Sequence, residues 1–400
     1  MKRIYCLIGL LTLVPMGLLS CTSISTKVST QNEPTSQVNT EAKALETLSK
    51  LIEGFKQSAT RGAASIYPDY YGGCFINDQK QLVVLTTNES GQAQIKSMTA
   101  NASNLIFKPC EFSYNYLNQV MDDLADHMIK NKDYKAINFI HCYLLDSANV
   151  VVVELLEYSP AKIEEFKRNV SDSPAIRFES AEDDQPVGIL QENAKVERDI
   201  TELYPGFGIS NSINAHGTIG YRVTCNNAIG FMTAGHVVAL NEIVKNSEGT
   251  KIGVGDLYDY KDGGTVDAAF VKVDDSSMLT NKFGTTGSNI STEIAAESLL
   301  VEGAKIVKFG GTTFYSEGEI LSPNVAVTTE LPNNTKRRVT FHISTTLNAE
   351  KGDSGGPVLT RSGYKLVGIL KARTELDDGT IVTALTRSSE IKKKFYCETY

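Results

Sequence analysis

The sequence predicts an α+β domain in the first half of the chain and an all-β domain of paired antiparallel barrels in the second. Three observations predict this. Apolar residues recur at helical spacing over residues 42–59 and 115–130. From about residue 204 onward, short strand-like runs separated by Gly and Asn replace that pattern. An acidic stretch with a proline lies between the two halves, so we place a junction there.

The first 21 residues have the plan of an export signal. Lys2 and Arg3 precede an apolar run over residues 4–19, which is short for a membrane span. The run ends in Leu18-Leu19-Ser20-Cys21, which resembles the bacterial lipobox, so we expect a lipid on Cys21. An ordinary cleaved signal with a chance cysteine is the alternative. Residues 22–41 have the polar composition of a flexible tether, and together these features predict an extracytoplasmic protein anchored to a membrane by lipid.

Composition places the rest of the chain among ordinary soluble proteins. Of 400 residues, 41% are hydrophobic and 22% charged, which excludes collagen-like, disordered and multi-span membrane chains. The net charge is −8, with the excess acid in the first half after residue 21. The dense basic runs at 336–338 and 392–394 have no interleaved aromatic residues, so we interpret them as solvated faces and expect no nucleic-acid partner.

The cysteines indicate neither a dense disulfide scaffold nor a metal centre. Five follow the signal at long spacings, without a Cys-x-x-Cys or His-Glu-x-x-His pattern. We therefore expect no metal and no cofactor. Most of these cysteines are expected to be buried thiols, and the sequence allows a bridge between Cys225 and Cys397 without establishing it.

Residues 42–180 are predicted to form the α+β domain. Besides the two amphipathic helices, strand-like runs occur at 82–86 and 149–153, and Ser159-Pro160 reads as an N-cap followed by proline in the first helical turn. No catalytic cluster is visible there. Residues 181–204 are the predicted junction.

Residues 205–400 are predicted to form the β domain. Two hairpins are expected, one pairing 218–225 with 228–233 around Asn226-Asn227, the other pairing 251–260 with 265–273. Further strands are expected at 301–309, 318–321, 338–344 and 364–372.

The strongest chemical signal is Gly352-Asp353-Ser354-Gly355-Gly356-Pro357. A serine in a tight glycine turn exposes its hydroxyl, and bare backbone N–H groups beside it can stabilise an oxyanion. The string also fits the nucleophile elbow of α/β-hydrolases, but that fold needs its histidine after the serine. All five histidines precede Ser354, so that class is excluded.

Two further residues complete a candidate triad. Among the histidines, His236 has the best context, because an apolar strand leads into Thr233-Ala234-Gly235 and leaves room beside the imidazole. Asp267 stands in the otherwise apolar run 265–271, where a carboxylate is costly unless it accepts hydrogen bonds. His342 lies in an alternating strand and is expected to be structural. Other nearby aspartates are expected to be solvated, and these are Asp256, Asp259, Asp262, Asp274 and Asp275.

The order His236, Asp267, Ser354, with Thr-Ala-Gly-His and Gly-Asp-Ser-Gly-Gly-Pro, resembles the chymotrypsin-like serine proteases, in particular the streptogrisin and α-lytic protease branch. The string 309–313 resembles the segment that opens the second barrel in that branch. The resemblance implies a double β-barrel that hydrolyses protein or peptide substrates through a Ser-His-Asp triad and an acyl-enzyme. It also implies an oxyanion hole at the N–H groups of Gly352 and Ser354, and a buried cationic partner for Asp353.

The first half resembles, more weakly, the pro-regions of the same branch, through Tyr71-Gly72-Gly73-Cys74-Phe75-Ile76-Asn77-Asp78. This implies that residues 42–180 are a folding and inhibitory segment, an intramolecular partner of the protease that is cut off within 181–206. A permanent accessory domain is the alternative.

Two departures from the family pattern are visible. Val237 stands where a cysteine commonly follows the histidine, and strand 367–373 lacks the glycines that often wall the specificity pocket. Lys371 or Arg373 would favour an acidic residue before the cut if they faced the pocket, but we expect both to point outward. The rival function is a catalytically silent surface lipoprotein that uses the barrels as a binding module.

Overall fold

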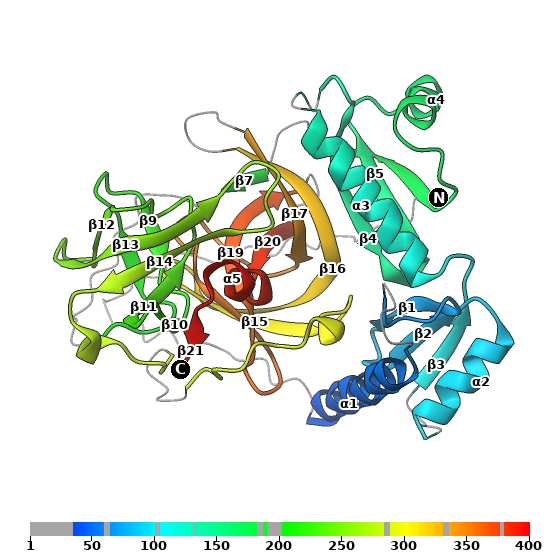
Figure 1. The fold of residues 1–400 in the computed structure, drawn as a ribbon, viewed down its shortest axis with the longest axis horizontal. Coiled ribbons are helices and arrows are strands. Elements are labelled where there is room, and N and C mark those ends of the chain that lie inside the picture. Colours follow the sequence, from blue (N-terminus) through cyan, green and yellow to red (C-terminus); the bar gives the residue numbers. More distant parts are fainter. Residues whose placement is uncertain are drawn as a thin grey trace, which may run out of the picture.

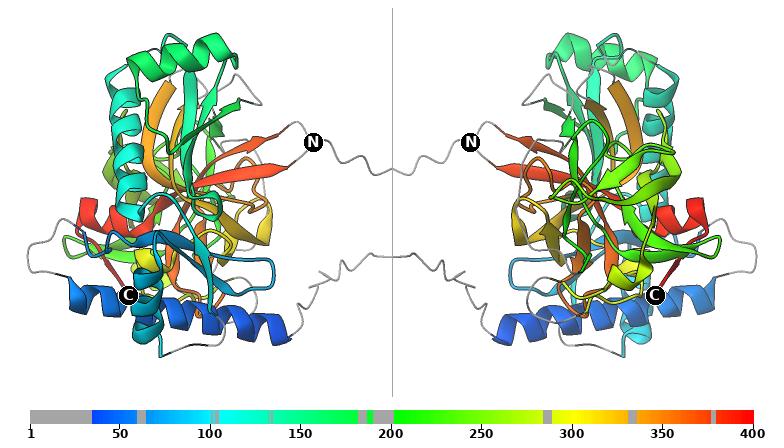
Figure 2. Two further views of the ribbon diagram at one scale, coloured as in Figure 1. Left: turned by 90° about the vertical axis from the view of Figure 1, so that its right-hand side faces the viewer. Right: turned by 90° about the vertical axis from the view of Figure 1, so that its left-hand side faces the viewer.

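A computed structural model describes residues 35–59, 65–100, 102, 105–131, 133, 135–181, 187–189, 202–283, 289–330, 336–376 and 380–400. The predicted signal with Cys21, residues 22–34 of the tether and most of the junction lie outside these residues. Figures 1 and 2 show a helix-containing N-terminal half beside a strand-rich C-terminal half. Among the described residues, no helix is both long and apolar enough to cross a membrane.

The N-terminal half begins with an αβ layer. Helix α1 (Thr35–Ser58) confirms the predicted helix and starts earlier than expected. A three-stranded sheet follows, made of β1 (Tyr71–Ile76), β2 (Leu82–Thr86) and β3 (Leu105–Pro109), with α2 (Glu89–Met98) joining the parallel pair β2–β3. Helix α2 was not predicted, and a local cap starts it, since the Asn88 side chain accepts from the Gly91 N–H at 2.8 Å.

A second layer contains α3 (Tyr114–Lys130), β4 (Phe139–Leu145), the 3-10 turn η1 (Asp146–Ala148), β5 (Val150–Leu155), α4 (Pro160–Asn169) and β6 (Ile176–Ser180). The predicted cap of α4 is confirmed, because Ser159 Oγ accepts from the Lys162 N–H at 3.3 Å. The apolar face of α3 packs on β4 and β5 in one core cluster.

The first sheet of the C-terminal half has the order β21-β10-β11-β14-β13-β12-β8-β9. Both predicted hairpins are confirmed, since β10 pairs with β11 and β13 with β14. Asn226 and Asn227 both have positive φ in the first turn, which suits asparagine. The strands are β8 (Gly208–Ser210), β9 (His216–Thr218), β10 (Arg222–Cys225), β11 (Ala228–Thr233), β12 (Ile243–Lys245), β13 (Lys251–Tyr260), β14 (Asp267–Val273) and β21 (Glu398–Thr399).

The second sheet of this half has the order β15-β18-β19-β20-β17-β16. Its strands are β15 (Lys305–Gly310), β16 (Phe314–Glu330), β17 (Lys336–Thr345), β18 (Pro357–Thr360), β19 (Leu366–Glu375) and β20 (Ile381–Arg387), and α5 (Ser388–Phe395) follows them. The short 3-10 turns η2 (Ser276–Met278) and η4 (Glu297–Leu299) come before β15 in the chain. The predicted strand 318–321 is only part of the long β16. A disulfide joins Cys225 of β10 to Cys397, between α5 and β21, and so ties the C-terminal segment to the first sheet.

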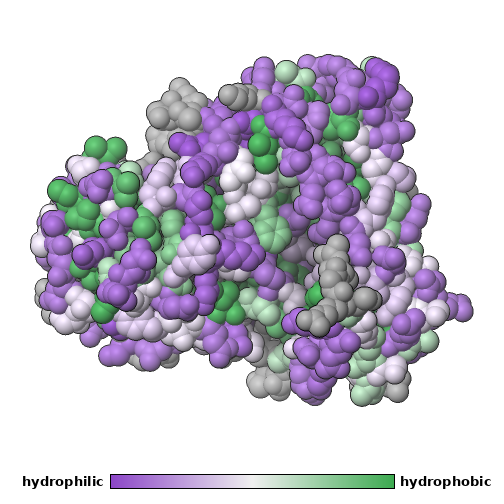
Figure 3. Space-filling view, in the orientation of Figure 1, coloured by the Kyte–Doolittle hydropathy of each residue, from purple (hydrophilic) through white to green (hydrophobic). Residues whose placement is uncertain are grey.

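The two halves are continuous through β16. Its middle pairs with β4 (Val325↔Tyr143, Ala326↔Cys142), so β4-β5-β6 extend the second sheet (Figure 1). One hydrophobic cluster runs from α1 and β1 into β15, β17 and β19. On the face drawn in Figure 3, hydrophilic residues cover most of the surface. Hydrogen bonding and shared core therefore hold the halves together as one structure.

Candidate active site

His236 lies just beyond the end of β11, where small residues let the chain approach β14. A side chain at Gly235 would come within 3.0 Å of the backbone of Asp259 and Ala268, so glycine is needed for this close approach. The backbone N–H of His236 donates to Asp267 Oδ1 at 2.9 Å. The aspartate thus fixes the loop as well as the ring.

The structure brings the three candidate residues together. His236 Nδ1 lies 2.8 Å from Asp267 Oδ2, and His236 Nε2 lies 2.8 Å from Ser354 Oγ. Asp267 and Ser354 are fully buried, and His236 is only 9% exposed. Burial alone would raise the pKa of Asp267, but the charge of Lys371 and the contacts with His236 outweigh it and hold that pKa well below its usual value.

Ser354 lies in a loop that needs two glycines. Gly352 and Gly355 have φ of +99° and +89°, in the left-handed region, and a side chain at Gly355 would meet Thr233 Oγ1 at 2.2 Å. Thr218 of β9 holds the loop from the first sheet, because its N–H donates to Ser354 O at 2.8 Å and its Oγ1 to Gly352 O at 2.7 Å. The N–H groups of Gly352 and Ser354, the predicted oxyanion donors, donate to no other described residue.

Comparison with known proteins finds three families along the chain. The trypsin family matches residues 223–394, and Pro-like N-terminal and C-terminal domains match 32–110 and 115–181. The C-terminal half is a trypsin-family serine endopeptidase domain. No curated protein matches the chain. The predicted fold class, a chymotrypsin-like protease domain preceded by an α+β domain of pro-region type, is confirmed.

Solved structures of bacterial proteases are similar to about half of the chain. Nocardiopsis protease is 22% identical, with 50% of this chain and 98% of that one covered and a TM-score of 0.41. Thermobifida fusca protease A is 24% identical with the same coverage and a TM-score of 0.40. An α-lytic protease homolog, N4, is 18% identical, with 50% and 100% covered and a TM-score of 0.41.

In the protease domain, Asp353 has the buried cationic partner that the resemblance implied. It is Lys308 of β15, whose Nζ lies 2.8 Å from Asp353 Oδ2, and both side chains are fully buried. The N–H groups of Thr312 and Thr313 donate to Oδ1 at 2.8 and 3.1 Å. Burial would raise the pKa of Asp353, but Lys308 and the hydrogen bonds from the Thr313 hydroxyl and the Glu350 N–H outweigh it and lower the pKa. No sequence signal marked Lys308, which lies 45 residues away.

The expectation that Lys371 points outward is wrong. This side chain is fully buried, and its Nζ lies 2.6 Å from Asp267 Oδ2. The reason is the pairing itself, because a lysine can be buried when a carboxylate balances its charge. Arg373, two residues further along the chain, is partly buried and forms ion pairs with Glu350 and Glu375. Asp259, expected to be solvated, is also buried, in an ion pair with Lys394.

His342 is buried behind the candidate triad, as its structural role predicted. Its Nδ1 lies 2.9 Å from Thr340 O and its Nε2 3.2 Å from Thr386 Oγ1. Burial, with the nearby charge of Lys371, lowers its pKa to about 3, so it is neutral. The remaining histidines, His127, His141 and His216, make none of the contacts with Asp267 or Ser354 that His236 makes.

One strand of the junction meets the protease domain near this site. Strand β7 (Val187–Ile189) pairs antiparallel with β19 at Ala372 and Arg373. Lys371 is the residue of β19 that precedes Ala372, and its carbonyl accepts a hydrogen bond from Ser354 Oγ at 3.3 Å. Strand β7 of the junction therefore pairs with β19 directly beside the residue whose carbonyl contacts the nucleophile Ser354.

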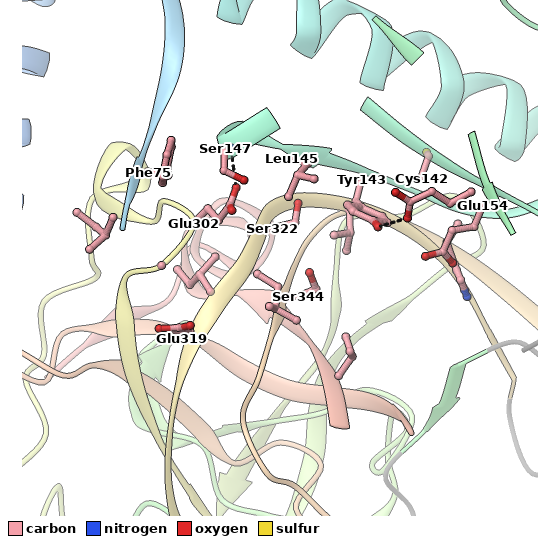
Figure 4. Close-up of a pocket in the computed structure, with 18 of the residues that line it drawn as sticks. Phe75, Cys142, Tyr143, Leu145, Ser147, Glu154, Glu302, Glu319, Ser322 and Ser344 are labelled. Atoms are coloured by element: carbon pink, nitrogen blue, oxygen red, sulfur yellow. Dashed lines mark hydrogen bonds between the residues drawn. The ribbon is translucent and has the colours of Figure 1, made fainter. Parts of the chain in front are cut away.

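A separate cleft of about 690 Å³ lies between β4 and β5 of the Pro-like domain and β16 of the protease domain (Figure 4). At its rim, Tyr143 donates to Glu179 at 3.3 Å, and the Ser147 N–H donates to Glu302 at 2.9 Å. His236, Asp267 and Ser354 do not line it. The cleft therefore belongs to the domain interface and not to the candidate active site.

Proposed function

We propose that the chain is the precursor of an exported serine endopeptidase that cleaves peptide bonds through Ser354, His236 and Asp267. The observation that carries the proposal is the continuous hydrogen-bonded path from Ser354 Oγ through the His236 ring to Asp267 Oδ2, with 2.8 Å at each step. Nucleophile, base and orienting carboxylate have the geometry that acyl transfer requires.

In the proposed mechanism, Ser354 Oγ attacks the scissile carbonyl carbon while His236 Nε2 takes its proton. The carbonyl oxygen becomes an oxyanion that the N–H groups of Gly352 and Ser354 stabilise. His236 then gives its proton to the leaving amine as the C–N bond breaks, which leaves an acyl-enzyme. Water attacks this ester with His236 again as base, the bond between the acyl carbon and Ser354 Oγ breaks, the carboxylic acid product leaves, and His236 returns the proton to Ser354 Oγ. Asp267 stays ionised throughout and stabilises the imidazolium.

We further propose that residues 42–180 inhibit the protease until the chain is cut within 181–206. The pairing with β19 of β7, which follows these residues in the junction, supports this, because an extended strand there occupies a backbone edge next to Ser354 until the junction is cut. The predicted lipid on Cys21 lies on the N-terminal side of the cut. Cleavage would then release the protease domain outside the cytoplasm, while the Pro-like region stays on the membrane.

The Ser354→Ala variant tests the proposal. It should remove all peptide hydrolysis and any self-cleavage, and a fluorophosphonate should label the parent protein on Ser354 but not the variant. Processing and activity that persist in Ser354→Ala would contradict the proposal. A parent protein whose mature form takes no label would instead support the silent binding module.

A further inference from the structure

Lys371 shares one oxygen atom with the candidate catalytic histidine. Asp267 Oδ2 lies 2.6 Å from Lys371 Nζ and 2.8 Å from His236 Nδ1. All three side chains are removed from solvent. The carboxylate that orients the imidazole is thus also the partner of a buried cation.

Lys371 is held in place from a second side by an aromatic ring. Its Nζ lies 4.0 Å from the ring centroid of Tyr260, and this ring in turn makes an edge contact with His236 at 6.1 Å. Tyr260 is fixed by Thr329, whose Oγ1 lies 2.8 Å from the phenol oxygen. Burial would lower the pKa of Lys371, but Asp267 and Tyr260 outweigh it and raise that pKa, so the lysine is charged at neutral pH.

Other titratable groups around this pair come from three strands. Tyr258 and Tyr260 lie on β13, Arg337 and His342 on β17, and Arg387 on β20. His342 is neutral, and the Arg337 guanidinium lies over the Tyr260 ring at 4.7 Å. None of these groups makes an ion pair with Asp267 among the described residues, so Lys371 is the cation that balances its charge.

The charge balance around His236 therefore differs from that of a triad alone. An aspartate with a neutral histidine carries one negative charge, and protonation of the ring brings the pair to zero. With Lys371 present, the buried group is already neutral, and protonation leaves a net positive charge in a low-dielectric site.

We propose that Lys371 is a positioning residue that holds Asp267 and extends the activity of His236 as a base to lower pH. It acts through the carboxylate and touches no substrate. The inference rests on the proposed function only in so far as His236 is the base, because the protonation of His236 can be measured without turnover.

The first experiment compares pH–rate profiles of processed parent and Lys371→Met protein. Removing the charge should move the acid limb of kcat/KM upward by about 1–2 pH units, since a nearby charge shifts a titration by about that much. Lys371→Arg retains the charge and should restore the parental limb. A Lys371→Met limb at the parental pH would overturn the proposal.

The second experiment uses the full-length chain with Ser354→Ala, in which turnover and self-cleavage cannot interfere. NMR of labelled histidine rings follows the His236 signal, assigned by its loss in His236→Gln, across the pH range. Adding Lys371→Met should move the midpoint of the His236 titration to higher pH, by about the same 1–2 pH units as the acid limb of the rate profile. The matched control is Lys308→Met, which removes another fully buried lysine but one paired with Asp353, and should leave the His236 titration in place.

These outcomes separate the two proposals. A His236 titration that is equal in Lys371→Met and in its parent, with both folded, makes the lysine purely structural. An equal upward shift in Lys308→Met would also overturn a specific role for Lys371. Failure of fluorophosphonate labelling would end the proposed function but would leave the titration result valid.

Discussion

Two buried aspartates, one in each half of the chain, have opposite environments. Asp267 in the protease domain contacts Lys371 and His236, and these partners lower its pKa although it is fully buried. Asp146 in the Pro-like region is 1% exposed, its Oδ1 has no hydrogen-bond partner among the described residues, and burial raises its pKa well above the usual value. The protease domain balances the charge of its buried aspartate, whereas burial of Asp146 favours the protonated form of its carboxyl group.

The two aspartates therefore differ in the ionisation state that their surroundings favour. The paired ions keep Asp267 ionised over the whole physiological range. Asp146 begins η1, between β4 and β5, and lines a small pocket with Tyr114, Glu297 and Arg387, where the Pro-like region meets the protease domain. Burial raises the pKa of this carboxyl group, so we expect its contribution to the contact between the halves to be lost as pH rises.

Removing the charge of Asp267, which pairs with Lys371 and His236, should have the largest effect. Asp267→Asn keeps the shape but removes the charge that holds the imidazole and stabilises the imidazolium, so kcat should fall on the order of ten-thousand-fold. Lys371 would also be left as a buried, uncompensated cation, at a cost of about 3–5 kcal/mol in unfolding free energy. Steady-state hydrolysis and urea unfolding measure the two effects. Near-normal turnover in a folded Asp267→Asn protein would remove Asp267 from the mechanism.

A smaller effect is expected at the second buried pair, Lys308–Asp353. Lys308→Met leaves the Asp353 carboxylate without its counter-charge, which should lower the unfolding free energy by about 3–5 kcal/mol. Lys50→Met is the matched control, because the Lys50–Glu46 pair lies on the exposed face of α1 and should contribute little. Both are measured by urea unfolding in the Ser354→Ala background. Equal losses in the two variants would show that burial does not decide the value of an ion pair here.

Local patterns in the sequence predicted much of the fold. The Asn226-Asn227 turn, the Ser159-Pro160 cap and the apolar stripe of α3 are all determined by residues within a few positions of one another, and each was predicted correctly. Helix α2 was not predicted, since the Asn88 cap precedes a segment with a weak apolar stripe. The Gly-Asp-Ser-Gly-Gly and Thr-Ala-Gly-His strings pointed to Ser354 and His236, which lie within hydrogen-bonding distance of each other in the structure.

What the sequence did not reveal depends on contacts between distant segments. Lys371 and Asp267 are 104 positions apart, and nothing near Lys371 in the chain indicates that a carboxylate awaits it. The general tendency of lysine to be exposed therefore gave the wrong orientation. The same holds for Lys308 with Asp353, and for β16, whose pairing with β4 joins strands about 180 residues apart. Charge pairing across strands is a property of the folded topology.

The smallest expected effect is at Asp146 and has the opposite sign. Its folded pKa is raised, so between about pH 4 and that raised pKa the folded state binds one proton more than the unfolded state. The contribution of Asp146 is thus fully present below about pH 4 and is lost as pH rises toward the folded pKa, by up to about 1.4 kcal/mol per pH unit. Asp146→Asn keeps a neutral side chain of the same shape at every pH. It should leave stability unchanged near pH 4 and raise it at pH 8, by about 1–3 kcal/mol in urea unfolding of the Ser354→Ala protein. A loss of stability at both pH values would mean that Asp146 accepts hydrogen bonds as a carboxylate, and the contrast with Asp267 would disappear.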